Sequence, residues 1–134
     1  MTGLLVNIDV DDVDKAVTFY RDALGLTVGR RFGSDFVEML GSTAPIYLLK
    51  KAAGSAPFKG GPGRDYGRHW TPVHLDFVVD DIAPAVERAV KAGATLESPP
   101  KAHAYGLLAL LADPFGNGFC LLQFTGRGYD EIVV

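Results

Sequence analysis

The chain has 134 residues, 48% of them hydrophobic and 22% charged, which suffices for one compact unit or two small modules sharing a core. Thirteen Lys and Arg against sixteen Asp and Glu give a net charge of -3, which argues against the basic face of a nucleic-acid binder. The single cysteine, Cys120, excludes an intrachain disulfide and favours a reducing compartment. No apolar run approaches the roughly 20 residues of a membrane helix, and no secretory signal is visible. We therefore expect a cytoplasmic protein that contacts neither nucleic acid nor membrane.

The first half predicts a strand, a helix and three further strands. Residues 5–10 alternate as a strand, and apolar residues then recur at spacings of three and four up to Leu24, as on one helical face. Asp12 can cap the first turn of this helix, and Gly25 can end it in a left-handed conformation. Strands are predicted for residues 26–31, 35–40 and 45–50.

The second half repeats this pattern at an offset of 69 residues, from position 5 to position 74. A strand at residues 74–79 is followed by Asp80-Asp81. A helix runs between Asp81 as its cap and Gly93, and strands follow at 95–99, 105–112 and 118–124. Residues 113–118 predict a hairpin turn, because Asn117-Gly118 tolerates a positive φ. We assign modules to residues 1–51 and 72–125, a Gly- and Pro-rich linker to 52–71 and a tail to 126–134.

Polar residues fall on the same face of the first strand in both copies. Asn7 and Asp9 alternate with three aliphatic residues, and His74 and Asp76 alternate with three apolar residues in the second copy. Burying an unpaired carboxylate is costly, so we interpret this face as the wall of a wet cavity. The alternative is that the polar face simply meets solvent.

Three stretches carry a family resemblance. They are residues 10–26, which contain Phe-Tyr-x-x-x-Leu-Gly, residues 74–82, and residues 113–117, which read Asp-Pro-x-Gly-Asn. With these motifs the chain resembles the vicinal oxygen chelate superfamily, which includes glyoxalase I, extradiol dioxygenases and bleomycin-resistance proteins. The resemblance implies an α+β fold of two βαβββ modules, whose antiparallel or mixed sheets form an incomplete barrel, or cup, with the helices outside. It also implies a homodimer.

The resemblance further implies where metal ligands would lie. In metal-using members, one ligand comes from the first strand of each module and one from a last strand, and these positions fall at Leu5, His74, near Leu48 and at Cys120. Only His74 keeps a usual ligand type, and Cys120 stands where the family usually has Glu. We therefore predict no metal and no other cofactor. The alternative is a divalent metal held by His74 with Asp76, Asp9 or Cys120.

The predicted function is binding of a small, apolar or aromatic ligand in the cup. The residues expected to contact or orient that ligand are Leu5, Asn7, Asp9, Leu48, Trp70, His74, Asp76 and Cys120. The alternatives are a metal-dependent lyase, isomerase or dioxygenase of the same superfamily, and a scaffold with a filled cup.

Three groups of side chains have two interpretations each. His74 and Cys120 are candidate catalytic residues, as a base and a nucleophile, although a cysteine that is merely small and buried is favoured. Trp70 is either an aromatic residue at the rim of the cup or a plug between the modules. The arginines at positions 30, 31, 64 and 68 are interpreted as solvated surface, the alternative being an anion contact at the mouth of the cup.

Overall fold

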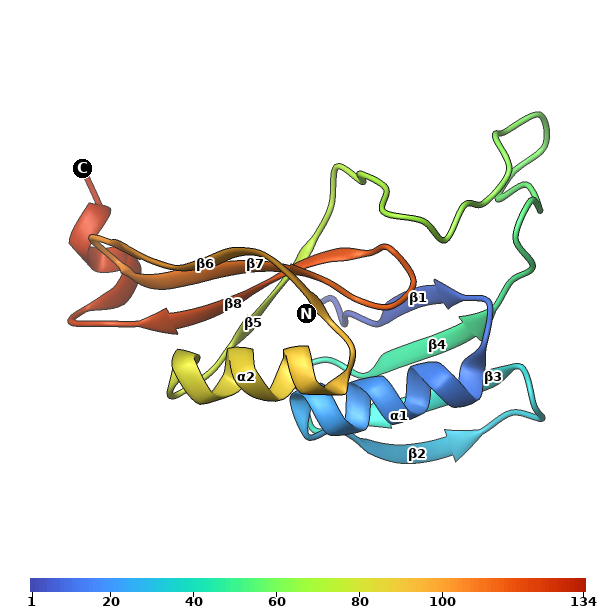
Figure 1. Ribbon diagram of the computed structural model, residues 1–134, viewed down its shortest axis with the longest axis horizontal. Helices are drawn as coiled ribbons and strands as arrows, with labels where there is room; N and C mark the ends of the chain where they lie inside the picture. The colour runs from blue at the N-terminus through green and yellow to red at the C-terminus, as the bar shows by residue number, and fades with distance from the viewer. The chain divides into compact units, whose positions relative to one another are not determined.

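Two strand–helix–three-strand modules make up the chain, which confirms the repeat predicted from the sequence (Figure 1). The computed structural model describes residues 1–134 and divides into two units, Met1–Gly67 and Arg68–Val134. Each unit contains one helix and one four-stranded mixed sheet that does not close into a barrel. No helix is long and apolar enough to cross a membrane.

Unit 1 consists of β1 (Val6–Val10), α1 (Val13–Leu24), β2 (Thr27–Arg31), β3 (Phe36–Leu40) and β4 (Ile46–Lys50). The strand order is β1-β4-β3-β2, with β1 parallel to β4 and the other pairs antiparallel. Helix α1 lies across β3 and β4 and covers one face of the sheet (Figure 1). The core between them is apolar and includes the buried side chains of Val10, Ala16, Phe19, Val37, Met39, Ile46 and Leu48.

Unit 2 consists of β5 (Leu75–Val78), α2 (Ile82–Ala92), β6 (Thr95–His103), β7 (Gly106–Ala112), β8 (Gly118–Phe124) and a 3-10 turn at Gly128–Ile132. Its strand order, β5-β8-β7-β6, repeats that of unit 1, and β5 is parallel to β8. Strand β6 is longer than the predicted residues 95–99. It continues through Pro99-Pro100 because it is the edge strand, where a residue without an N–H is tolerated, and its pairing shifts register on either side of Ser98.

The two helices are capped differently. In α1 the Asp12 Oδ1 atom accepts a hydrogen bond from the backbone N–H of Lys15 at 3.0 Å, and Gly25 ends the helix with a φ of 71°, as predicted. In α2 Asp81 occupies the predicted N-cap position, but its side chain makes no capping hydrogen bond. The Gln123 Oε1 atom of β8 accepts from the N–H of Ile82 at 2.9 Å instead, because the helix begins beside that strand.

The hairpin turn between β7 and β8 is confirmed, but the predicted reason is wrong. The positive φ, 81°, belongs to Gly116, whereas neither Asn117 nor Gly118 has one. The buried Asp113 carboxylate organises the turn: its Oδ1 accepts from the N–H groups of Phe115 and Asn117, and its Oδ2 accepts from the Asn117 side chain. The Asp-Pro-x-Gly-Asn motif is therefore a self-capping turn.

The segment assigned as a linker is divided between the two units. Its first part remains with unit 1, where the backbones of Gly54 and Ser55 hydrogen-bond to that of Arg64. Its last part belongs to unit 2, where Arg68 pairs with Glu97 at 2.6 Å and His69 contacts the Asn117 side chain at 2.9 Å.

Candidate functional site

Each sheet has one face under its helix and one face without a helix, which we call its open face. In unit 2 the register places Asp76, Cys120 and Leu110 side by side on three neighbouring strands. In unit 1 it places Asn7, Tyr47 and Glu38 in the corresponding row. In both units the polar residues of the first strand therefore lie away from the helix-covered core.

The unit 2 open face brings together three of the predicted site residues. The Nε2 atom of His74 lies 3.2 Å from Asp76 Oδ1, and the ligand atoms of His74, Asp76 and Cys120 all lie within 4.8 Å of one another. The His74 side chain is 57% exposed, whereas Cys120 is only 6% exposed. The cluster thus runs from solvent into the sheet. We call it the His-Asp-Cys cluster.

The thiol of Cys120 is held in its protonated form. Burial, the negative charge of Asp76 and a hydrogen bond to that carboxylate together raise the pKa of Cys120 to about 11. A thiol is a poor nucleophile until it loses its proton. The proximity of His74 therefore does not by itself make Cys120 a reactive nucleophile.

The donor set of this cluster fits a metal ion only in part. One imidazole, one carboxylate and one thiol are enough donors for an ion that keeps one open position, and a thiolate suits zinc better than a hard ion such as Mn2+. Binding would have to displace the thiol proton and separate His74 from Asp76. In unit 1 the corresponding positions are Leu5, Asn7 and Tyr47, none of which is a histidine, a cysteine or an acidic residue.

The register corrects the position predicted near Leu48. Asp76 pairs with Cys120, and its counterpart Asn7 pairs with Tyr47, so Tyr47 is the residue equivalent to Cys120. Leu48 pairs with Ile8 and is fully buried on the helix-covered face, away from Asn7. The prediction was displaced by one residue, which reverses the face of a strand.

The remaining predicted residues have different surroundings. Leu5 precedes β1 and is 60% exposed, and Trp70 is 80% exposed. Asp9 Oδ2 accepts a hydrogen bond from Arg64 Nε at 2.8 Å, and Arg64 also donates to the side chain and the backbone of Ser55. Asp9 therefore anchors the chain segment that follows β4.

The sequence analysis missed a buried carboxylate on the unit 1 open face. Glu38 is 5% exposed and accepts hydrogen bonds from the Arg30 backbone at 3.0 Å, from Arg30 Nη2 at 2.6 Å and from the Tyr47 hydroxyl at 2.9 Å. These bonds, chiefly those from Arg30, lower the pKa of Glu38 to about 2. The available signal was an acidic residue between Val37 and Met39 in the middle of an apolar strand.

Comparison with known proteins identifies the family. The model of a glyoxalase-like domain matches residues 5–122. The chain belongs to the glyoxalase-like domain family. This membership, with the folds below, supports the predicted resemblance to the vicinal oxygen chelate superfamily.

One curated relative of the glyoxalase-like chain is the anthracycline biosynthesis protein DauV of Streptomyces sp. (strain C5), which is 30% identical over 121 residues. The match covers 88% of this chain but only 40% of DauV, so the chain spans less than half of that relative.

Solved structures share the fold at low identity. The fosfomycin resistance protein FosX of Listeria monocytogenes has a TM-score of 0.74 at 16% identity, covering 99% of both chains. A glyoxalase/bleomycin resistance protein/dioxygenase family enzyme of Burkholderia phytofirmans PsJN has a TM-score of 0.68 at 22% identity, covering 90% of this chain and 97% of that one. A mutant FosX structure from Listeria monocytogenes is a complex with Mn(II) and 1S,2S-dihydroxypropylphosphonic acid.

Proposed function

We propose that the glyoxalase-like chain binds a small aromatic or apolar molecule on the open face around the His-Asp-Cys cluster and needs no metal ion to do so. The observation that carries this proposal is the engagement of the three donors with one another: Asp76 contacts His74 at 3.2 Å and hydrogen-bonds to a Cys120 thiol that stays protonated. A metal ion held here would first have to replace that thiol proton.

The surroundings of the cluster favour an apolar ligand with few polar groups. Val78, on the same face of β5 as Asp76, is 62% exposed and offers an apolar contact to a ligand, whereas its partner Leu122 on β8 is buried. Trp70, four residues before His74 in the chain and 80% exposed, is free to stack on a planar ring. His74 is the most exposed polar group of the cluster and would orient the ligand. A relative named for anthracycline biosynthesis agrees with an aromatic ligand.

The test is a fluorescence titration with an anthracycline and with smaller planar aromatic compounds, in the presence and absence of EDTA. We expect saturable binding that EDTA does not change and that His74→Ala weakens. His103→Ala is the matched control, because His103 is an exposed histidine of the same unit that stacks on Tyr105. Failure of folded protein to bind any compound of the panel would sink the proposal.

A second candidate, a metal-dependent lyase, isomerase or dioxygenase, is favoured by the three ligand atoms lying within 4.8 Å of one another. A divalent ion held by His74, Asp76 and Cys120 would polarise an oxygen atom of the substrate. Metal analysis of protein purified without chelators separates the candidates. A stoichiometric ion that is lost in Cys120→Ser supports the second, and compound binding that requires added metal would replace the first proposal with it.

The homodimer and the cytoplasmic location expected from the sequence remain predictions. The mass of the protein in solution, measured by light scattering, tests the first. Fractionation of cells that express the chain tests the second.

A further inference from the structure

The open face of unit 1 contains a buried carboxylate that the fold does not require. Tyr47 pairs with Glu38, and the equivalent Cys120 pairs with Leu110, so Leu110 is the counterpart of Glu38. The same sheet therefore forms in unit 2 with an apolar side chain at this position. Because burying a charge is costly, we expect the Glu38 carboxylate to have a role that exists only in unit 1.

Glu38 fixes one arginine in a single geometry. Arg30 Nε lies 3.1 Å from Oε1, Nη2 lies 2.6 Å from Oε2, and the Arg30 backbone N–H donates to Oε1 at 3.0 Å. A register shift between Val28 and Arg31 brings that N–H to the carboxylate. Gly29 leaves the necessary room, since a Cβ there would lie 2.5 Å from Oε1. Local backbone and side chains thus cooperate to hold Arg30.

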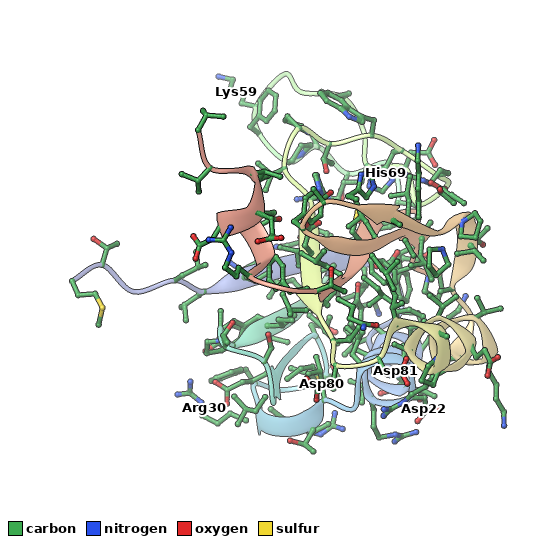
Figure 2. The ribbon with its side chains drawn as sticks, turned by 90° about the vertical axis from the view of Figure 1, so that its left-hand side faces the viewer. Asp22, Arg30, Lys59, His69, Asp80 and Asp81 are labelled. Atoms are coloured by element: carbon green, nitrogen blue, oxygen red, sulfur yellow. The ribbon has the colours of Figure 1, made fainter.

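The guanidinium nevertheless remains available to a ligand. The Arg30 side chain is 66% exposed, and Figure 2 shows its nitrogen atoms pointing outward at the margin of the unit 1 ribbon. Its Nε and Nη2 atoms bond to Glu38 and Tyr47, whereas Nη1 has no acceptor in the structure. An arginine fixed in advance loses less conformational entropy when it binds a ligand than a mobile one does.

Aromatic rings lie beside the guanidinium group of Arg30. The Arg30 Cζ atom is 5.5 Å from the centroid of the Phe32 ring, which is 44% exposed. The Phe32 and Phe36 rings follow at a centroid distance of 4.5 Å, and Phe36 contacts Tyr47 edge-on. The surface therefore combines a fixed hydrogen-bond donor of positive charge with an apolar aromatic platform.

We propose that Arg30, Phe32 and Phe36 form a binding site for a planar aromatic carboxylate. The carboxylate accepts hydrogen bonds from the Nη1 edge of Arg30, and the ring of the ligand packs against Phe32 and Phe36. Glu38 and Tyr47 position Arg30 and do not touch the ligand. This site lies in unit 1 and does not depend on the function proposed for the His-Asp-Cys cluster.

The test is a titration of 15N-labelled protein with 1-naphthoate, followed by the amide and arginine Nε–H signals in NMR spectra. We expect saturable shifts centred on residues 29–36, and at least about tenfold weaker binding of the neutral isostere 1-naphthamide, because charge-assisted hydrogen bonds are the stronger ones. Acetate, which lacks the ring, should also bind more weakly. Shifts centred elsewhere, or equal binding of the three compounds, would overturn the proposal.

Variants of Glu38 and Arg30 show whether ligand binding needs the fixed geometry of Arg30 or only its positive charge. Glu38→Leu copies Leu110, keeps Arg30 and releases it, so we expect loss of naphthoate binding by about tenfold. Arg30→Lys keeps the charge but not the fork of donors, and it should weaken binding similarly even if Glu38→Leu does not fold. The matched control is Arg31→Gln, at the neighbouring exposed arginine, which should bind naphthoate like the wild type. Equal effects at positions 30 and 31, or undiminished binding in folded Glu38→Leu, contradict the proposal.

Discussion

Asp76 and Cys120 occupy paired positions on the parallel strands β5 and β8, so their side chains leave the same face of the sheet. Burial and the neighbouring carboxylate together raise the pKa of the thiol to about 11, and unit 2 therefore contains a cysteine that stays protonated at neutral pH.

The first prediction concerns the reactivity of that thiol. Asp76→Asn removes a negative charge that opposes thiolate formation, so the pKa of Cys120 falls and alkylation by iodoacetamide at pH 8 becomes faster. Because Cys120 is the only cysteine, mass spectrometry of the labelled protein reports its rate directly. Asp80→Asn, at an exposed aspartate just beyond β5, should leave the rate unchanged. Identical rates in the wild type and Asp76→Asn would contradict this account.

A second prediction compares the two helix caps. Gln123→Ala removes the acceptor of the Ile82 N–H at the start of α2 and should lower the free energy of unfolding by about 1 kcal/mol. Asp12→Ala should cost a similar amount in α1. Asp81→Ala should be nearly neutral, because its side chain makes no capping bond. Urea unfolding measures all three, and a larger loss in Asp81→Ala than in Gln123→Ala would refute the assignment.

A third prediction concerns Gly29. In Gly29→Ala the new methyl group would meet Glu38 Oε1 at 2.5 Å and Leu40 Cδ1 at 2.9 Å, so both side chains must move and the ion pair between Glu38 and Arg30 is disturbed. We expect a loss of about 1–3 kcal/mol in the free energy of unfolding, as for other overpacked sites. Gly3→Ala is the control, since nothing lies within 4 Å of a Cβ at that position. Thermal unfolding should show a lowered midpoint only for Gly29→Ala.

The fourth prediction is a pH dependence of stability. The pKa of Glu38 is about 2 in the folded protein and has an ordinary value of 4.5, so its charged form favours folding above pH 4.5. This contribution is lost as the pH falls from about 4.5 towards 2, where the folded state also takes up the proton. The difference in unfolding free energy between the wild type and Glu38→Gln should shrink across that range. A difference that is constant with pH would show that the charge of Glu38 does not stabilise the fold.

The sequence was sufficient to predict the two modules, because the repeat, the helical periodicity and the glycine at each helix end are local signals. The end of β6 was missed because two prolines in a row normally argue against a strand, and only its place at the sheet edge permits them. The capping role of Gln123 was also invisible, since it joins residues 41 positions apart.

The candidate site could be predicted only as far as strand alternation allows. His74 and Asp76 follow from that alternation, but their contact with Cys120 depends on the register of β5 and β8. The same dependence displaced the prediction at Leu48 by one residue from Tyr47. The contacts of Glu38 with Arg30 depend on the shifted register between β2 and β3. A single sequence does not reveal such a shift.

The ion pair between Asp9 and Arg64 means that any ligand of the Asp9 carboxylate must compete with Arg64. Asp9 was expected to orient a ligand, yet its carboxylate already holds an arginine whose side chain is only 16% exposed. A cationic molecule that reached Asp9 would have to displace Arg64 and with it the hydrogen bonds to Ser55. Binding there would therefore leave residues 54, 55 and 64 joined only by the hydrogen bonds between their backbones.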